Sequence, residues 1–164
     1  MGERSDARNG SRRSFRRLAR REVVALALAG LVVLLATAGA LAVTGDLTQP
    51  AGSAGCVSET GSGPCADGHG LNHPFSVAVS PDGKSVYVAL YSGSTVTRLV
   101  RDTTTGAITQ PAGSAGCVSQ TGAGPCADGH GLNHAFSVAV SADGKSVYVA
   151  SFNSYAVARF NRAP

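Results

Sequence analysis

Two cysteines, an aspartate and two histidines stand close together in the stretch CVSETGSGPCADGHGLNH, residues 56–73. A near copy, CVSQTGAGPCADGHGLNH, occupies residues 117–134. These residue types allow three kinds of chemistry: metal ligation, acid–base catalysis by histidine, or a disulfide that pins a loop. The side chains with binding chemistry to offer in the two copies are Asp67, His69, His73, Asp128, His130 and His134.

A disulfide in each copy is the simplest use of the cysteines. Eight residues separate Cys56 from Cys65, and Cys117 and Cys126 repeat that spacing. Four cysteines allow three connectivities, and the repeat favours the two local pairs. Glycine, serine and alanine dominate the stretch, so it buries little apolar area, and a staple of this size adds roughly 2–3 kcal/mol in the chain-entropy model. We therefore expect the bonds Cys56–Cys65 and Cys117–Cys126.

Zinc is the alternative use, because two cysteines and two histidines form a legitimate zinc shell. The spacing between the cysteines is wider than that of common zinc motifs, and Gly68, Gly70 and Pro74 oppose a helix that would bring His69 and His73 to one face. Calcium would need more carboxylates than the stretch provides. We expect no metal and no cofactor. Whether the histidines face a partner or only their own loop stays open.

The distribution of charge argues against a nucleic-acid partner. The chain has a formal net charge of +4, but eight of its 14 basic residues are arginines at or before Arg21. From residue 23 onward, six basic residues face seven acidic ones. The folded part therefore has no basic footprint for a phosphate backbone.

The N-terminal segment has the pattern of an export signal or membrane anchor. Residues 1–22 form a basic tail, and residues 23–43 are uncharged and almost all apolar, long enough as a helix to cross a bilayer. The arginines predict a cytoplasmic tail and an outward-facing C-terminal part. Small residues near the end of the run also offer cleavage sites. SRRSF, residues 11–15, resembles the core of a twin-arginine export signal. We expect residues 44–164 to lie outside the cytoplasm, either held to the cell membrane by a single span or secreted, in a compartment where paired cysteines oxidise.

The outer part is a tandem duplication with an offset of 61 residues. About 42 of 59 aligned positions are identical between the first unit, 45–105, and the second, incomplete unit, 106–164. Alternating apolar residues and Pro-Asp-Gly turn chemistry predict short antiparallel strands. The expected strands of the first unit lie at residues 75–80, 85–90, 95–101 and 107–110, with an opening outer strand at 46–49. Four such strands per unit indicate the blade of a β-propeller. The fold class is therefore all-β, a partial propeller of about two four-stranded blades preceded by an N-terminal hydrophobic helix.

The amino-acid sequence of the repeat supports the same fold. SVAVSPDGKSVYVALYSGSTVTRL and SVAVSADGKSVYVASFNSYAVARF resemble the YVTN-type β-propeller repeat of exported bacterial proteins, which is grouped with the lactonase-like propellers. The resemblance implies a propeller blade and does not specify a reaction. Propellers close with about four to eight blades, and two are present. Truncation, assembly of several chains into a ring, and a lone two-blade unit remain as explanations, although the last would leave strand edges exposed.

For function, a non-enzymatic role is favoured over catalysis. No nucleophile elbow is present, and the only glutamate of the first unit, Glu59, is replaced by Gln120 in the second. We expect a membrane-tethered or secreted repeat module with a binding or structural role, whose partner is a protein or a carbohydrate. The alternative is a lactonase-like hydrolase of which this chain is a fragment or one subunit of a homo-oligomeric ring.

Overall fold

The computed structural model describes residues 45–163, and the strands belong to a compact unit that begins at Thr48. The predicted tail at 1–22 and the hydrophobic helix at 23–43 lie outside the described residues. Among the residues that are described, no helix is long and apolar enough to traverse a bilayer.

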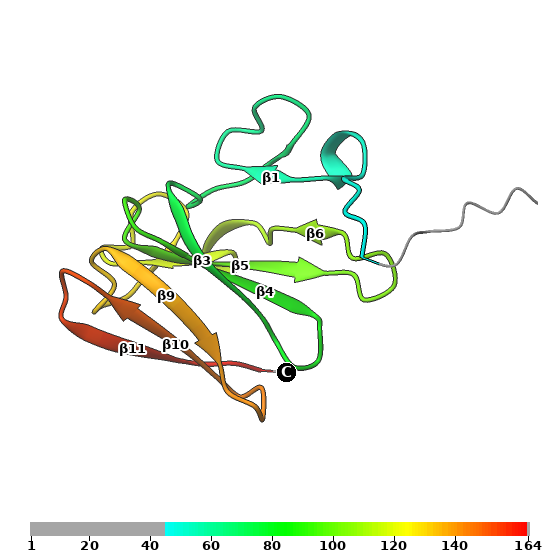
Figure 1. Ribbon diagram of the computed structural model, residues 1–164. Coiled ribbons are helices and arrows are strands. Elements are labelled where there is room, and N and C mark those ends of the chain that lie inside the picture. The colour runs from blue at the N-terminus through cyan, green and yellow to red at the C-terminus, as the bar shows by residue number, and fades with distance from the viewer. Residues whose placement is uncertain (1–44, 164) are drawn as a thin grey trace, which may run out of the picture. The chain divides into compact units, whose positions relative to one another are not determined.

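The first blade is a four-stranded antiparallel sheet, as the repeat predicts (Figure 1). A tight turn joins its first two strands, because Ser80 and Asp82 accept hydrogen bonds inside it and Gly83 takes the positive φ of 69° that the turn needs. Alternation along the chain sends apolar side chains to both faces of the sheet. The strands are β3 (Pro74–Val79), β4 (Ser85–Leu90), β5 (Thr95–Arg101) and β6 (Ile108–Thr109).

The second disulfide stretch completes this blade instead of merely linking it to the next one. After the short 3-10 turn η2 (Gly113–Ala115), the chain returns to the outer edge of β5 as β7 (Cys117–Ser119). Strand β8 (Ala127–Asp128) then pairs with β7 in parallel. The interpretation of this stretch as a stapled loop is therefore incomplete, because the free backbone groups at the β5 edge offer partners that local sequence does not reveal.

The first disulfide stretch has the same local structure without a neighbouring blade edge. It contains η1 (Gly52–Ala54) followed by the parallel pair β1 (Val57–Ser58) and β2 (Ala66–Asp67). The opening strand expected at residues 46–49 is not formed. Its counterpart β6 exists by pairing with β5, and within residues 45–163 no strand offers residues 46–49 the same partner.

The second blade contains three strands in the described residues, β9 (Ala135–Val140), β10 (Ser146–Ser151) and β11 (Ala156–Asn161). Its innermost strand β9 lies against β3 and β4 of the first blade (Figure 1). The two sheets thus pack face to face, which is the arrangement of adjacent propeller blades. The expectation of an all-β, partial propeller is confirmed.

Two apolar clusters hold this arrangement. The larger one lies between the blades, where Tyr87, Ala89 and Val96 of the first blade meet Leu132 and Val138 of the second. The smaller one covers the opposite face of the first blade, where Leu71 from the first disulfide stretch packs over the cluster that contains Leu90. Burial of these side chains is the main favourable contribution to folding.

Candidate functional site

Both cysteine pairs expected from the sequence are bonded, Cys56 to Cys65 and Cys117 to Cys126. Cys117 is the more deeply placed cysteine, since it lies within β7 on the edge of the first blade and is buried. The bonds leave no thiolate for the zinc shell considered above. Within residues 45–163, no three histidine, cysteine or acidic side chains gather as a metal site would require.

His69 joins the first disulfide stretch to the segment that precedes the second one. Its backbone N–H donates to Oε1 of Gln110 at 2.7 Å, and Nε2 of Gln110 donates back to the carbonyl of His69 at 2.7 Å. The imidazole Nε2 lies 3.3 Å from the carbonyl oxygen of Gly113. This reciprocal contact places His69 as a structural group between repeats.

His134 also contacts the other repeat, but by a different route. Its ring stacks on Tyr91 with a centroid separation of 4.2 Å, and its backbone N–H donates to the Ser94 hydroxyl at 3.1 Å. His73, its counterpart in the first repeat, is exposed, and its Nδ1 lies 2.5 Å from Oδ1 of Asn72. The other members of the predicted binding loops, Asp67, Asp128 and His130, are exposed. The structure thus distributes the six residues over separate surroundings.

The Glu59 side chain accepts a hydrogen bond from the backbone. Its carboxylate accepts from the N–H of Leu71, and Gln120 accepts from the N–H of Leu132 in the second repeat at 2.6 Å. An amide oxygen serves this position as well as a carboxylate does. The exchange of Glu59 for Gln120 between repeats is therefore explained by a shared acceptor role.

The turn carboxylates are held in the ionised form. Asp82 accepts from the guanidinium of Arg162, from the Ser80 hydroxyl and from the backbone N–H of Lys84, and these bonds place the pKa of Asp82 well below its ordinary value. Hydrogen bonds from Ser141 and the Lys145 N–H lower the pKa of Asp143. Groups so strongly acidic are poor proton donors at neutral pH.

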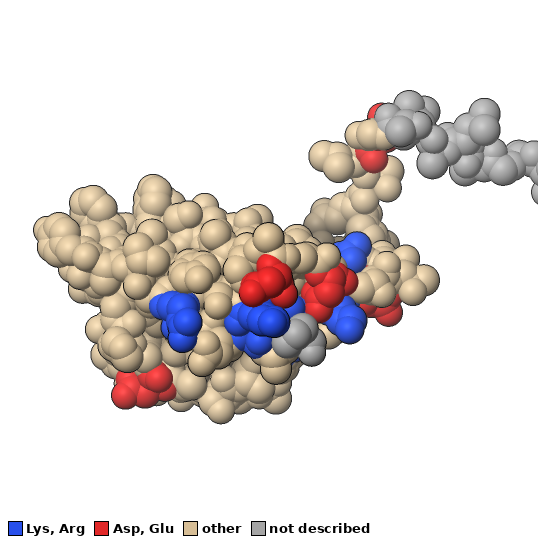
Figure 2. All heavy atoms as spheres, turned by 90° about the horizontal axis from the view of Figure 1, so that it is seen from below, with Lys and Arg blue, Asp and Glu red and all other residues tan. Residues whose placement is uncertain are grey.

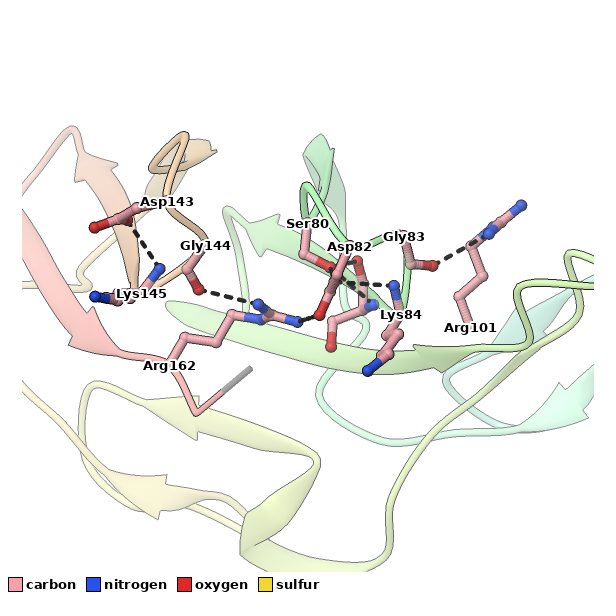
Figure 3. Close-up of polar contacts among 10 residues, drawn as sticks. Ser80, Asp82, Gly83, Lys84, Arg101, Asp143, Gly144, Lys145 and Arg162 are labelled. Atoms are coloured by element: carbon pink, nitrogen blue, oxygen red, sulfur yellow. Dashed lines mark hydrogen bonds and ion pairs between the residues drawn. The ribbon is translucent and has the colours of Figure 1, made fainter.

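These charges form a band on the surface. Figure 2 shows acidic and basic side chains gathered side by side along one face, with uncharged residues over most of the remainder of that view. Figure 3 shows one contact among such side chains, in which Arg162 donates to the carbonyl of Gly144 in its own blade and to Asp82 of the first blade. The sequence pattern gave no sign of this contact, because its partners are 80 residues apart.

A cavity of about 350 Å³ opens between the blades beside this contact. Arg98 and Tyr87 line it from the first blade, and Phe160 and Arg162 line it from the second. The Tyr87 phenol and the Arg98 guanidinium suit a polar or anionic ligand group, and the apolar wall suits a carbon skeleton, whereas the Arg162 guanidinium is already bonded to Asp82 and Gly144. No pair of free acid and base groups accompanies them among the lining residues.

The sequence model of one family, described as "Lactonase, 7-bladed beta-propeller", matches residues 56–160. No curated protein matches the chain. Similar solved structures include a proposed 6-phosphogluconolactonase from Bacteroides fragilis, with 23% identity over 55% of this chain and 21% of that one, at a TM-score of 0.39.

Two further solved structures are similar over parts of the chain. A protein from Lactobacillus plantarum has 34% identity over 46% of this chain and 20% of its own length, at a TM-score of 0.35. Hydrazine synthase from Kuenenia stuttgartiensis has 20% identity over 73% of this chain and 23% of its own length, at a TM-score of 0.37. The chain spans less than a quarter of each of these three structures.

Proposed function

Because the chain belongs to the family of seven-bladed lactonase propellers, we propose that its two repeats serve as blades of an exported, lactonase-like hydrolase. The observation that carries this proposal is the extent of the family match, which covers most of both repeats. The reaction would be hydrolysis of a cyclic ester: water adds to the carbonyl carbon, the ring C–O bond breaks, and a hydroxy acid leaves. The described residues contribute the blades, and no catalytic residue is assigned among them.

Export is part of the proposal. The basic tail at 1–22 followed by the apolar run at 23–43 supports it, together with two disulfides in a chain that has four cysteines. A phosphatase that is active only outside the cytoplasm, fused after residue 164, would be active in intact cells if the orientation is right. An inactive fusion would contradict it.

The hydrolase proposal is tested with the full chain and a panel of five- and six-membered lactones, with proton release as the measurement. We expect hydrolysis above the spontaneous rate, lost in Leu132→Asp, which places a charge in the core between the blades. Thr104→Ala, at an exposed turn, is the matched control and should keep the rate. Hydrolysis that survives Leu132→Asp would point to a contaminating enzyme.

A second candidate is a non-enzymatic module that binds a protein or a carbohydrate. The favouring observation is that Asp82, Glu59 and His69 are all engaged in turns or in contacts between segments. A spontaneous rate with every lactone, together with saturable binding on a glycan or protein array, would establish this second function in place of the first.

A further inference from the structure

Each blade has an apolar face that fits the neighbouring blade. The second blade leaves one such face exposed in the described residues, and the outer face of the first blade is partly exposed, at Val77 and Val79, while Val86 and Val88 are already buried. Val96 of the first blade is 6% exposed because the second blade covers it, whereas its counterpart Val157 is 67% exposed. On the opposite faces, Val138 is 7% exposed and its counterpart Val77 is 65% exposed. The exposed face of the second blade is thus built like the covered face of the first. The outer face of the first blade is in turn built like the covered face of the second.

The residues of these faces are conserved between the two repeats of this chain. Tyr148, Ala150 and Val157 repeat the residues that the first blade presents to the second, Tyr87, Ala89 and Val96. The side chains that the second blade presents in return, Leu132, Val138, Val140, Val147 and Val149, repeat Leu71, Val77, Val79, Val86 and Val88.

The strand edges are complementary in the same direction. β5 pairs with β7 in the register Val96 to Val118, and within residues 45–163 the equivalent edge of β11 has no strand partner. Cys56, Val57 and Ser58 have the same sequence as β7 and are paired only with β2 in this part of the chain. An unpaired edge of this kind is a template for strand addition.

The polar contacts between the blades can also be repeated at the exposed face. Nη1 of Arg101 donates to the carbonyl of Gly83 at 3.1 Å, as Nη1 of Arg162 does to Gly144 at 3.0 Å, so both guanidinium groups have the same anchor (Figure 3). Arg162 then reaches Asp82 of the preceding blade. Asp143 is the counterpart of Asp82, which makes it the partner for Arg101 across a repeated interface.

An apolar hollow of about 600 Å³ lies at the exposed face, between Phe136, Phe152, Tyr155 and Val157. In the first blade, the corresponding surface around Tyr91 is covered by His134 from the second repeat. One contact cannot be repeated, because Tyr155 stands where Ser94 accepts from the His134 N–H. The aromatic side chain adds apolar area there instead.

We propose that a second copy of this chain docks head to tail, with its first blade on the exposed face of the second blade and its Cys56–Ser58 segment beside β11. Val57 of the second copy then lies opposite Val157, and Arg101 of the second copy pairs with Asp143. A heterologous contact of this kind continues into a closed ring or an open series of blades. The proposal rests on the interface between the blades, so it stands or falls independently of lactone hydrolysis.

Register-specific cross-linking tests the docking directly. All four native cysteines are bonded, so an added cysteine is the free thiol of its chain. Full-length Val57→Cys chains mixed with full-length Val157→Cys chains in mild detergent should form a cross-linked dimer on oxidation. Val57→Cys mixed with Ala156→Cys is the matched control and should cross-link several-fold less, because adjacent strand residues point to opposite faces. Equal yields from both mixtures would overturn the proposed register.

Association without added cysteines is the second measurement. Light scattering of the full-length chain should give a discrete oligomer, and Val157→Asp should reduce it to a monomer. Ala123→Asp adds the same charge at an exposed loop position and should leave the oligomer intact. A monomeric native chain that fails to cross-link overturns the proposal and leaves the exposed face to another polypeptide segment. An aggregate that Val157→Asp leaves unchanged also overturns it, because the association would then not use this face.

Discussion

Nη2 of Arg162, just beyond the last strand, lies 2.6 Å from Oδ2 of Asp82 in the first turn of the other blade. The guanidinium side chain is only 5% exposed. The nearby carboxylate raises the pKa of Arg162, so both partners remain charged across the ordinary pH range. This ion pair ties the two blades together.

A double-mutant cycle on this pair should reveal coupling between the blades. We expect Asp82→Asn and Arg162→Gln each to lower the free energy of unfolding, and the double variant to lose less than the sum, because the second change removes an interaction already lost. Urea denaturation measures the free energy of unfolding of the native chain, the two single variants and the double variant. Strict additivity would show that the ion pair contributes nothing to the blade contact.

Acid should destabilise the fold. The folded-state pKa values of Asp82, Asp102 and Asp143 are lowered by hydrogen bonds, and for Asp82 chiefly by Arg162. A carboxylate with a lowered pKa stabilises the folded state above its unfolded pKa of about 3.9, and this contribution is lost as the pH falls through the folded value. The denaturation midpoint should therefore decrease as the pH falls below about 4. The decrease should be smaller in Asp82→Asn, and an identical decrease would contradict the assignment.

The two halves of the duplication should respond unequally to the same core change. Leu132 is fully buried between the blades, whereas Leu71 is half-buried over the first blade. We expect Leu132→Ala to cost about 2–5 kcal/mol of unfolding free energy and Leu71→Ala about 1–2 kcal/mol. Chemical denaturation of the two variants provides a matched comparison. Equal losses would mean that Leu71 is covered as Leu132 is, by a segment outside residues 45–163 or by another molecule.

Removing the second disulfide should be more damaging than removing the first. Replacing Cys117 and Cys126 by serine should cost about 2–4 kcal/mol, because it opens a closed loop and also places a hydroxyl at a buried position of β7. The same change at Cys56 and Cys65 should cost less, since Cys56 is only half-buried. Thermal unfolding of the two paired variants, under oxidising conditions, measures the difference.

The acceptor role of Glu59 predicts that charge is dispensable there. Glu59→Gln should keep the stability of the native chain, because Gln120 performs the same task at Leu132, while Glu59→Ala should lose roughly 1 kcal/mol. The denaturation midpoints of the Glu59→Gln and Glu59→Ala variants, compared with that of the native chain, measure these effects. Any lactone hydrolysis should also survive Glu59→Gln, and its loss would reassign Glu59 to catalysis.

The sequence was sufficient for what local patterns encode. Alternating valines and the Asp-Gly turns place β3, β4 and β5 within about a residue of their expected bounds, and the repeat indicated both cysteine pairs. The short strand β7 escaped prediction because a Gly- and Ser-rich stretch has little strand propensity, and its pairing depends on the β5 edge. The contacts of Arg162 and His134 also escaped it, because they depend on how two blades pack.

The position of β7 has a consequence for the order in which the polypeptide acquires its shape. Strand β5 is followed by β6 and η2 before residues 117–119, at the start of the second disulfide stretch, pair with its outer edge. As the chain emerges during synthesis, the sheet of the first repeat thus stays incomplete until residues 117–119 of the second repeat have been made. Oxidation of Cys117 with Cys126 closes the segment that begins with β7, so we expect disulfide formation to stabilise the completed sheet.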